Sequence, residues 1–204
     1  MNLTRELTHP RLWRRVAVAY SVYVVLTLVS FAFGYFLLPR GALANTPWTA
    51  AGAMAAGAKT PLRQFLTTLV FNLGFVLVLG VLLNLQRVRG FPTGYVFVFS
   101  AGILSGLIAG TNSFAAQTIS PYTLEGWLVA LRIQHLELLG YTVIVASTIA
   151  IGLREYTSWL PWKTKESGIQ TWRHIRLTRQ EWLGIAIGLA MLLLAAYNET
   201  LLGL

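Results

Sequence analysis

The stretch that decides the fold is residues 16–38, VAVAYSVYVVLTLVSFAFGYFLL, because it contains no charged side chain. A bilayer core about 30 Å thick is crossed by about 20 apolar residues of helix. This run is therefore long enough to span a membrane as one helix.

The same length test finds four further spans, at residues 65–85, 94–116, 136–153 and 182–202. Residues 94–116 are uncharged but rich in glycine, whereas residues 136–153 form a shorter run that begins at a polar cluster. The sequence therefore predicts an all-α fold. We expect residues 1–204 to form a single membrane domain, a polytopic bundle of about five transmembrane helices.

The composition indicates a membrane protein and excludes the functions that depend on cysteine. The 204 residues are 55% hydrophobic and 11% charged, with a mean hydropathy of +0.61, whereas a soluble domain carries about 25% charged residues. The chain has no cysteine, which excludes disulfides, thiolate zinc sites, iron–sulfur clusters and a cysteine nucleophile. It also has no aspartate, so its seven acids are all glutamates.

Positive charge is distributed unevenly over the connections between the spans. Twelve of the 16 basic residues fall on one side: Arg5, Arg11, Arg14, Arg15, Arg87, Arg89, Arg154, Lys163, Lys165, Arg173, Arg176 and Arg179. The other side holds Arg40, Lys59, Arg63 and Arg132. By the positive-inside rule we predict a cytoplasmic N-terminus and an outside C-terminus, in a multi-pass protein of the bacterial inner (plasma) membrane.

The first span has features of a secretory signal peptide. Four arginines precede it, and Ala42-Leu43-Ala44 resembles a cleavage site. The apolar run is longer than the 7–15 residues typical of a signal peptide, so we expect it to be a retained helix.

Small residues are spaced for close helix packing. Gly102, Gly106 and Gly110 recur every four residues and share one helix face. This stripe predicts either contact with a partner chain, including a second copy, or packing within the bundle. We favour packing within the bundle because such spacings recur in many membrane proteins.

The predicted cytoplasmic segment 154–181 is basic and aromatic. Within it Ile169, Trp172 and Ile175 recur every three residues, and Arg173, Arg176 and Arg179 lie beside them. This pattern predicts an amphipathic helix on an anionic leaflet, with the three arginines in contact with lipid headgroups. The alternative is a docking surface for a cytoplasmic partner. No nucleic-acid-binding module accompanies the basic residues, so we expect no nucleic acid partner.

The sequence holds little that suggests catalysis. There is no phosphate-binding glycine loop and no His-Glu-x-x-His zinc motif. One polar cluster, residues 132–137, contains Arg132, His135 and Glu137 at the edge of the fourth span. It is either a polar helix start at the outer interface or a contact for a partner. We therefore predict no enzyme and no catalytic, metal or cofactor site, although a bound pigment or lipid stays open.

At this cluster the chain resembles the stage II sporulation protein M family. The residues that carry the resemblance are His135 and Glu137 at the start of an apolar helix, Asn72 in the second span, and the turn at residues 90–94 before a glycine-rich span. Leu136 stands where the family has glycine, and Glu137 follows the histidine more closely than in the family. The resemblance implies a membrane scaffold that assembles with extracytoplasmic peptidoglycan-degrading partners. It assigns Asn72, His135 and Glu137 to helix packing or partner contact.

We therefore predict a non-enzymatic membrane scaffold or assembly subunit that binds partner proteins and anionic lipids, as an oligomer or within a larger complex. One alternative is an accessory transmembrane subunit of a larger redox or photosynthetic complex, in which His135 or His174 would ligate a pigment. The other is the membrane subunit of an ATP-driven transporter, for which polar residues such as Asn72 and Asn84 would line a path.

Overall fold

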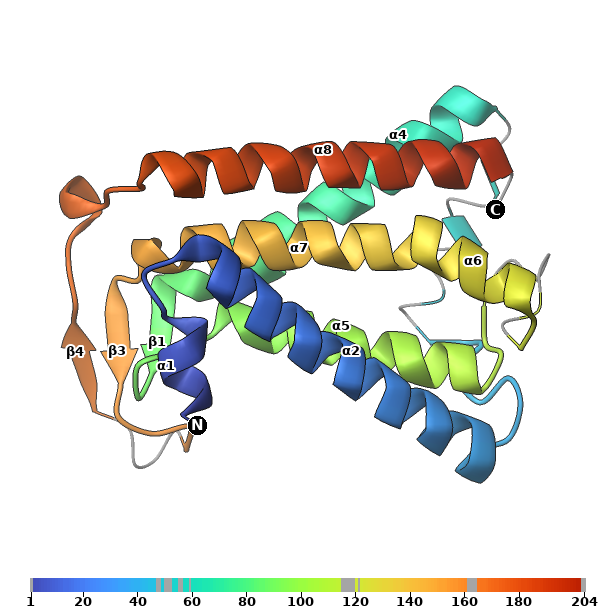
Figure 1. The fold of residues 1–204 in the computed structure, drawn as a ribbon, viewed down its shortest axis with the longest axis horizontal. Helices are drawn as coiled ribbons and strands as arrows, with labels where there is room; N and C mark the ends of the chain where they lie inside the picture. The colour runs from blue at the N-terminus through green and yellow to red at the C-terminus, as the bar shows by residue number, and fades with distance from the viewer. Residues whose placement is uncertain are drawn as a thin grey trace.

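The structure is a computed structural model that describes residues 2–46, 49, 53, 54, 57, 58, 60–114, 120, 122–160 and 165–202. It is a bundle of helices aligned along one long axis, with a small β-sheet at one end (Figure 1). The all-α membrane bundle predicted from the sequence is confirmed as the fold class, and the sheet is an addition to it.

Four helical stretches of the described chain are long and apolar enough to cross a membrane. They are α2 (Leu12–Leu37), α4 with η1 and η2 (Pro61–Leu85), α6 with α7 and η3 (Leu124–Ile151), and α8 (Arg179–Leu202). The shorter apolar helix α5 (Gly94–Gly110) runs between the same two ends of the bundle (Figure 1). A short helix, α1 (Leu3–Leu7), precedes them, and the chain termini lie at opposite ends of the long axis.

The long helix α2 begins and ends close to the predicted bounds of residues 16–38. The second span is composite: α4 (Pro61–Phe75) begins at the N-cap Thr60, whose side chain accepts a hydrogen bond from the amide of Arg63. It continues as a π-helix, η1 (Val76–Val81), and ends in a 3₁₀ turn, η2 (Leu83–Leu85).

The third span is shorter than the predicted 94–116, because the chain terminates α5 at Gly110. The amide of Thr111 donates to the carbonyl of Leu107, and the amide of Ser113 donates to that of Ile108, both at 2.9 Å. Asn112 has the left-handed φ of 51° that closes a helix C-terminus. Residues 115 and 116 lie outside the described residues.

The fourth span begins earlier than the predicted residue 136. A nine-residue helix, α6 (Leu124–Arg132), is capped by Thr123 and leads through Ile133 into α7 (Gln134–Thr148) and η3 (Ile149–Ile151). The prediction was wrong because Arg132 interrupts the apolar run, although the backbone hydrogen bonds continue across it. The polar cluster therefore does not begin the span but lies inside it.

A four-stranded sheet lies at one end of the bundle, in the order β2-β1-β3-β4. The strands are β1 (Gln86–Val88), β2 (Phe91–Pro92), β3 (Arg154–Tyr156) and β4 (Glu166–Gly168). Strand β1 pairs in parallel with β3, while the two outer pairs are antiparallel. The sheet therefore joins two connections that are far apart in the sequence.

This sheet corrects the prediction for residues 154–181. Among its described residues, the segment contains two strands and the 3₁₀ turn η5 (Trp172–His174) before α8 begins at Arg179, so the predicted amphipathic helix is wrong there. The spacing of Ile169, Trp172 and Ile175 does not produce a helical face. Residues 161–164, including Lys163, lie outside the described residues.

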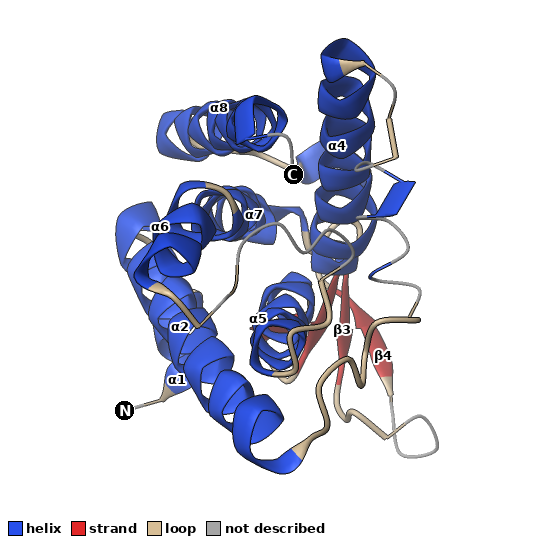
Figure 2. Cartoon of the chain, turned by 90° about the vertical axis from the view of Figure 1, so that its right-hand side faces the viewer, coloured by secondary structure: helices blue, strands red, loops and turns tan. Residues whose placement is uncertain are grey.

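Helix α7 is the central element of the bundle, with α8, α4, α2 and α5 around it in the end view (Figure 2). All its residues from Leu138 to Thr148 are buried except Leu139. Asn84 holds η2 against it: the Asn84 amide donates to the carbonyl of Val145 at 2.8 Å and to the hydroxyl of Thr148 at 2.9 Å. Polar side chains thus connect helices where apolar burial alone gives no force in lipid.

Candidate functional site

The candidate site is a cluster of polar side chains inside the membrane-spanning helices, which we call the carboxyl cluster. It consists of Tyr23, Thr68, Asn72, His135, Glu137, Tyr141 and Glu199. Ionisable side chains within a membrane are costly and commonly mark a functional position.

Helix α7 contributes two hydrogen-bonded members of the carboxyl cluster. Glu137 and Tyr141 are one helical turn apart, and the Tyr141 hydroxyl donates to Oε1 of Glu137 at 2.6 Å. Tyr141 is buried and Glu137 is half-buried, so the tyrosine holds the carboxyl in one orientation.

Helix α4 turns two polar residues inward. Thr68 and Asn72, one turn apart, are its only buried residues. Asn72 faces the carboxyl of Glu137, and Thr68 faces that of Glu199. Neither the Thr68 hydroxyl nor the Asn72 side-chain nitrogen makes a hydrogen bond of normal geometry.

Helix α8 contributes a second carboxyl. Glu199 lies three residues before the end of the helix at Leu202 and is half-buried. It is close enough to Glu137 for the two carboxyls to interact electrostatically. Its neighbour Asn198 donates to the backbone carbonyl of Arg132 at 3.0 Å, which fixes this end of α8 against α6.

Helix α2 covers the remaining side with two tyrosines. The Tyr20 hydroxyl and Nδ1 of His135 are 3.0 Å apart, and the Tyr23 ring packs edge-on against the imidazole at 5.9 Å. Tyr23 is fully buried, and its hydroxyl has no hydrogen-bond partner. Four helices therefore direct polar groups towards Glu137.

No cationic side chain balances these two carboxyls within the described part of the chain. The ion pairs there are Arg14–Glu6, Arg15–Glu181 and Arg154–Glu166, all away from the carboxyl cluster. Among the described residues, no group of three or more His, Cys, Asp or Glu side chains has a metal-binding arrangement.

The structure brings together some of the residues singled out from the sequence and separates others. Asn72, His135 and Glu137 belong to the carboxyl cluster. Arg132 ends α6 with its side chain exposed. Thr68 and Glu199 were missed, although Glu199 is, besides Glu137, the only acid within the five predicted spans.

The glycine stripe lies elsewhere and is covered by α2 of the same chain. A Cβ on Gly102 would meet the Tyr23 ring at 2.7 Å, and one on Gly106 or Gly110 would collide with the backbone carbonyl of Thr27 or Phe31. The stripe therefore packs inside the bundle and offers no free face to a second chain.

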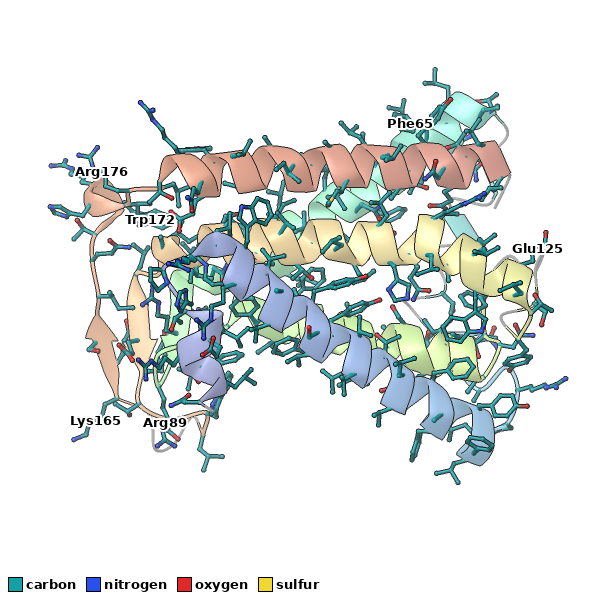
Figure 3. The ribbon with its side chains drawn as sticks, in the orientation of Figure 1. Phe65, Arg89, Glu125, Lys165, Trp172 and Arg176 are labelled. Atoms are coloured by element: carbon teal, nitrogen blue, oxygen red, sulfur yellow. The ribbon has the colours of Figure 1, made fainter. Side chains whose placement is uncertain are left out.

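The opposite end of the bundle carries the basic residues, and we call its sheet with the neighbouring turns the basic cap. Figure 3 shows Arg89, Lys165, Trp172 and Arg176 at this end, and Phe65 and Glu125 at the other. The three arginines predicted to contact lipid, Arg173, Arg176 and Arg179, are all exposed. Trp159 and Trp172 are also exposed, at 56% and 65%.

A buried ion pair joins α2 to the first turn of α8, next to the basic cap. Arg15 of α2 donates to Glu181 of α8 at 2.9 Å, and both side chains are more than nine-tenths buried. Glu181 also accepts from the amide of Thr178 at 2.8 Å, while the Thr178 hydroxyl accepts from the amide of Glu181. This reciprocal capping box begins α8 at a fixed position.

The length and composition of the apolar helices indicate a membrane protein, and the carboxyl cluster and the basic cap are candidate sites on its described residues. Comparisons with protein-family models, curated proteins and solved structures find no match. The resemblance to the stage II sporulation protein M family therefore stays a prediction.

Proposed function

We propose that this chain is a non-enzymatic scaffold or assembly subunit of the inner membrane, and that it binds partner proteins and anionic lipids through the basic cap. The observation that carries the proposal is the combination of exposed tryptophan and arginine on the turns beside a small sheet. Trp and Arg are enriched at the energetic centres of protein interfaces. A folded cap holds them in place, which reduces the entropy lost on binding.

The charge of the cap supports the lipid part of the proposal. Arg89, Arg154, Lys165 and the three arginines at 173, 176 and 179 are exposed on one end of the bundle. Each basic residue near an anionic leaflet contributes about 1 kcal/mol of attraction. Exposed Trp159 and Trp172 suit the headgroup level, where the ring is dry and the N–H is wet.

The family resemblance adds a partner on the other side. It implies an extracytoplasmic peptidoglycan-degrading protein, and in the predicted orientation the end with α6 and Glu125 faces outside. We propose this end as the second contact surface. Partners would then bind at both ends of one membrane bundle.

The test is purification from native membranes in mild detergent, with mass spectrometry and an absorption spectrum of the same sample. The variant Trp172→Ala with Arg173→Ala removes an exposed ring and an exposed charge from the cap. Its matched control is Leu62→Ala with Arg63→Ala, an exposed apolar residue and arginine at the opposite end. We expect the cap variant, and not the control, to lose the cytoplasmic partners by about tenfold or more, since an interface hot spot contributes about 2 kcal/mol.

Equal recovery of partners by wild type, cap variant and control would contradict docking on the cap. A coloured assembly of many subunits would instead favour the accessory-subunit alternative. An ATPase among the partners would favour the transporter alternative, for which the polar groups of the carboxyl cluster are the structural argument.

A further inference from the structure

We propose that an open pocket in the basic cap binds the phosphate headgroup of an anionic phospholipid, with Arg89 as the residue that holds the phosphate. The pocket has a volume of about 350 Å³ and is lined by Thr4, Val88, Arg89, Phe91 and Trp159. The inference rests on the proposed binding of anionic lipid by the cap, and it adds the site at which one headgroup is recognised.

The first argument is the backbone conformation of Arg89. Strands β1 and β2 are joined by the two-residue turn Arg89-Gly90, because Val88 pairs directly with Phe91. Both turn residues have a positive φ, 52° for Arg89 and 78° for Gly90. Turns of this kind favour Asn-Gly, Asp-Gly or Gly-Gly, and a long side chain at positive φ is strained. An arginine at this position therefore indicates a role for its side chain rather than for the turn.

The second argument is that the turn is fixed while the arginine side chain is available. The amide of Arg89 donates to the carbonyl of Tyr156 at 2.9 Å, which continues the pairing of β1 with β3. The Arg89 side chain is exposed, and none of the ion pairs in the described part of the chain includes it. Its guanidinium is therefore held beside the pocket without a carboxylate to neutralise it.

The walls of the pocket are held in place by contacts with the bundle. The ring of Phe91 packs against those of Trp159 and Tyr95, with centroids 5.8 and 6.2 Å apart. Tyr95 is fully buried, and its hydroxyl donates to the carbonyl of Leu7 at 3.0 Å. This bond fixes α1, which contributes Thr4, against the start of α5. A pocket formed in advance loses little entropy when a ligand binds.

The lining selects a ligand that is anionic at one end and apolar at the other. The guanidinium of Arg89 is a planar fork of donors that matches two oxygens of a phosphate. Val88, Phe91 and the exposed ring of Trp159 supply apolar surface beside it. A free phosphate ester would use the arginine alone, whereas a phospholipid would also cover the apolar walls.

The position of the pocket also favours a lipid. The hairpin of β1 and β2 joins two membrane helices, since the second span ends at Leu85 and α5 begins at Gly94. Strands of three and two residues, at about 3.4 Å per residue, extend only about 10 Å from those helix ends. The pocket therefore lies close to the headgroup level. Figure 3 shows Arg89 at the cap end, which the positive-inside rule assigns to the cytoplasm, where the leaflet is anionic.

The test is binding of short-chain lipids to the purified full-length protein in an uncharged detergent, measured by native mass spectrometry across a titration. The probes are dioctanoyl phosphatidylglycerol, which is anionic, dioctanoyl phosphatidylcholine, which has no net charge, and glycerol phosphate, which is an anionic headgroup without acyl chains. We expect one tight site per chain for phosphatidylglycerol. The other two probes should bind about tenfold more weakly or worse, because each lacks the charge or the apolar part.

The decisive variant is Arg89→Asn, since Asn-Gly is favoured in this turn. Its Tm should stay constant or rise, while its affinity for phosphatidylglycerol should fall by about tenfold or more, the value of a hydrogen bond to a charged group. The matched control is Arg176→Asn, an exposed arginine of the cap that lies apart from Arg89 (Figure 3). It should change the affinity by less than about twofold at physiological salt, which screens charges beyond about 8 Å. Trp159→Ala should weaken phosphatidylglycerol by several-fold and glycerol phosphate much less.

Several results would overturn the pocket. One is equal binding of phosphatidylglycerol by wild type and Arg89→Asn, and another is an equal loss in Arg89→Asn and Arg176→Asn. Equal affinities for phosphatidylglycerol and glycerol phosphate would reject the lipid and assign the pocket to a free phosphate ester.

Failure of the pocket is distinct from failure of the proposed function. A preference for the anionic lipid that Arg89→Asn retains in full would reject the pocket alone, because the cap would still bind anionic lipid. Equal binding of the two lipids by the wild-type protein would reject the lipid part of the proposed function, and the pocket with it.

Discussion

The ion pair between Arg15 and Glu181 is the most buried charge interaction in the described chain. Removing one member leaves the other charge buried without a partner, which costs about 3–5 kcal/mol. We expect Glu181→Gln to lower stability by about that amount, measured as unfolding of the purified protein in detergent. The double variant Arg15→Met with Glu181→Met should recover most of the loss.

An exposed ion pair on the cap gives the matched control. Arg154 and Glu166 are 3.1 Å apart, with side chains 60% and 47% exposed. Glu166→Gln should therefore cost about 0–1 kcal/mol. Equal losses from Glu166→Gln and Glu181→Gln would show that burial does not set the strength of the Arg15–Glu181 pair.

A pH dependence is expected at the N-terminal helix. Arg14 donates two hydrogen bonds to Glu6, at 2.7 and 2.9 Å, and this contact holds the pKa of Glu6 below its usual range. The docking of α1 on α2 is therefore supported above the ordinary glutamate pKa and loses this support as pH falls through the lowered value. The protection of the α1 amides from hydrogen exchange, corrected for the intrinsic pH dependence of exchange, should fall at acid pH in the wild type and stay constant in Glu6→Gln.

At the scale of elements, the contact between α2 and α5 depends on glycine. A Cβ at Gly106 would collide with the Thr27 carbonyl of α2, and backbone cannot move aside as a flexible side chain does. We expect Gly106→Ala to lower the Tm by several degrees, about 1–3 kcal/mol of overpacking. Gly74→Ala on α4 is the control, since nothing lies within 4 Å of its Cβ position. Equal Tm values for the two variants would contradict close packing of α2 on α5.

The membrane-spanning helices were predictable wherever the apolar run is unbroken. Helix α2 follows from an uncharged apolar run and α8 from an apolar run that only Glu199 interrupts, whereas α6 was missed because Arg132 interrupts the run that it begins. Strands of three residues such as Arg154–Tyr156 leave no detectable alternation of apolar and polar side chains. The sheet depends on pairing with β1, which is a tertiary contact.

The carboxyl cluster was predictable only in part for the same reason. Glu137 and Asn72 are visible as polar residues in or beside predicted spans. Their proximity to Thr68 and Glu199 follows from how α4, α7 and α8 pack, which no local pattern encodes. That no cationic side chain of the described residues pairs with these carboxyls also emerges only when the helices are assembled.

At the scale of the whole molecule, the surface suits a lipid environment. Large apolar side chains are exposed along the outer helices, including Val29 and Phe36 on α2, Val70 on α4 and Leu194 on α8. Soluble proteins rarely expose contiguous apolar patches of this kind. The basic residues gather at one end of the same bundle (Figure 3), as the positive-inside rule requires of a cytoplasmic end.

The arrangement of the cap inside and the carboxyl cluster towards the outside depends on an odd number of membrane crossings. Thr46 lies between α2 and α4, and Ser167 lies in β4 of the basic cap, so the two are at opposite ends of the bundle. The chain has no cysteine, and Thr46→Cys and Ser167→Cys each introduce a unique thiol. In intact cells, a membrane-impermeant maleimide should label the Thr46→Cys protein, and should label the Ser167→Cys protein only after the membrane is opened. Labelling of both from the same side would contradict the five-crossing arrangement and the sidedness of both sites.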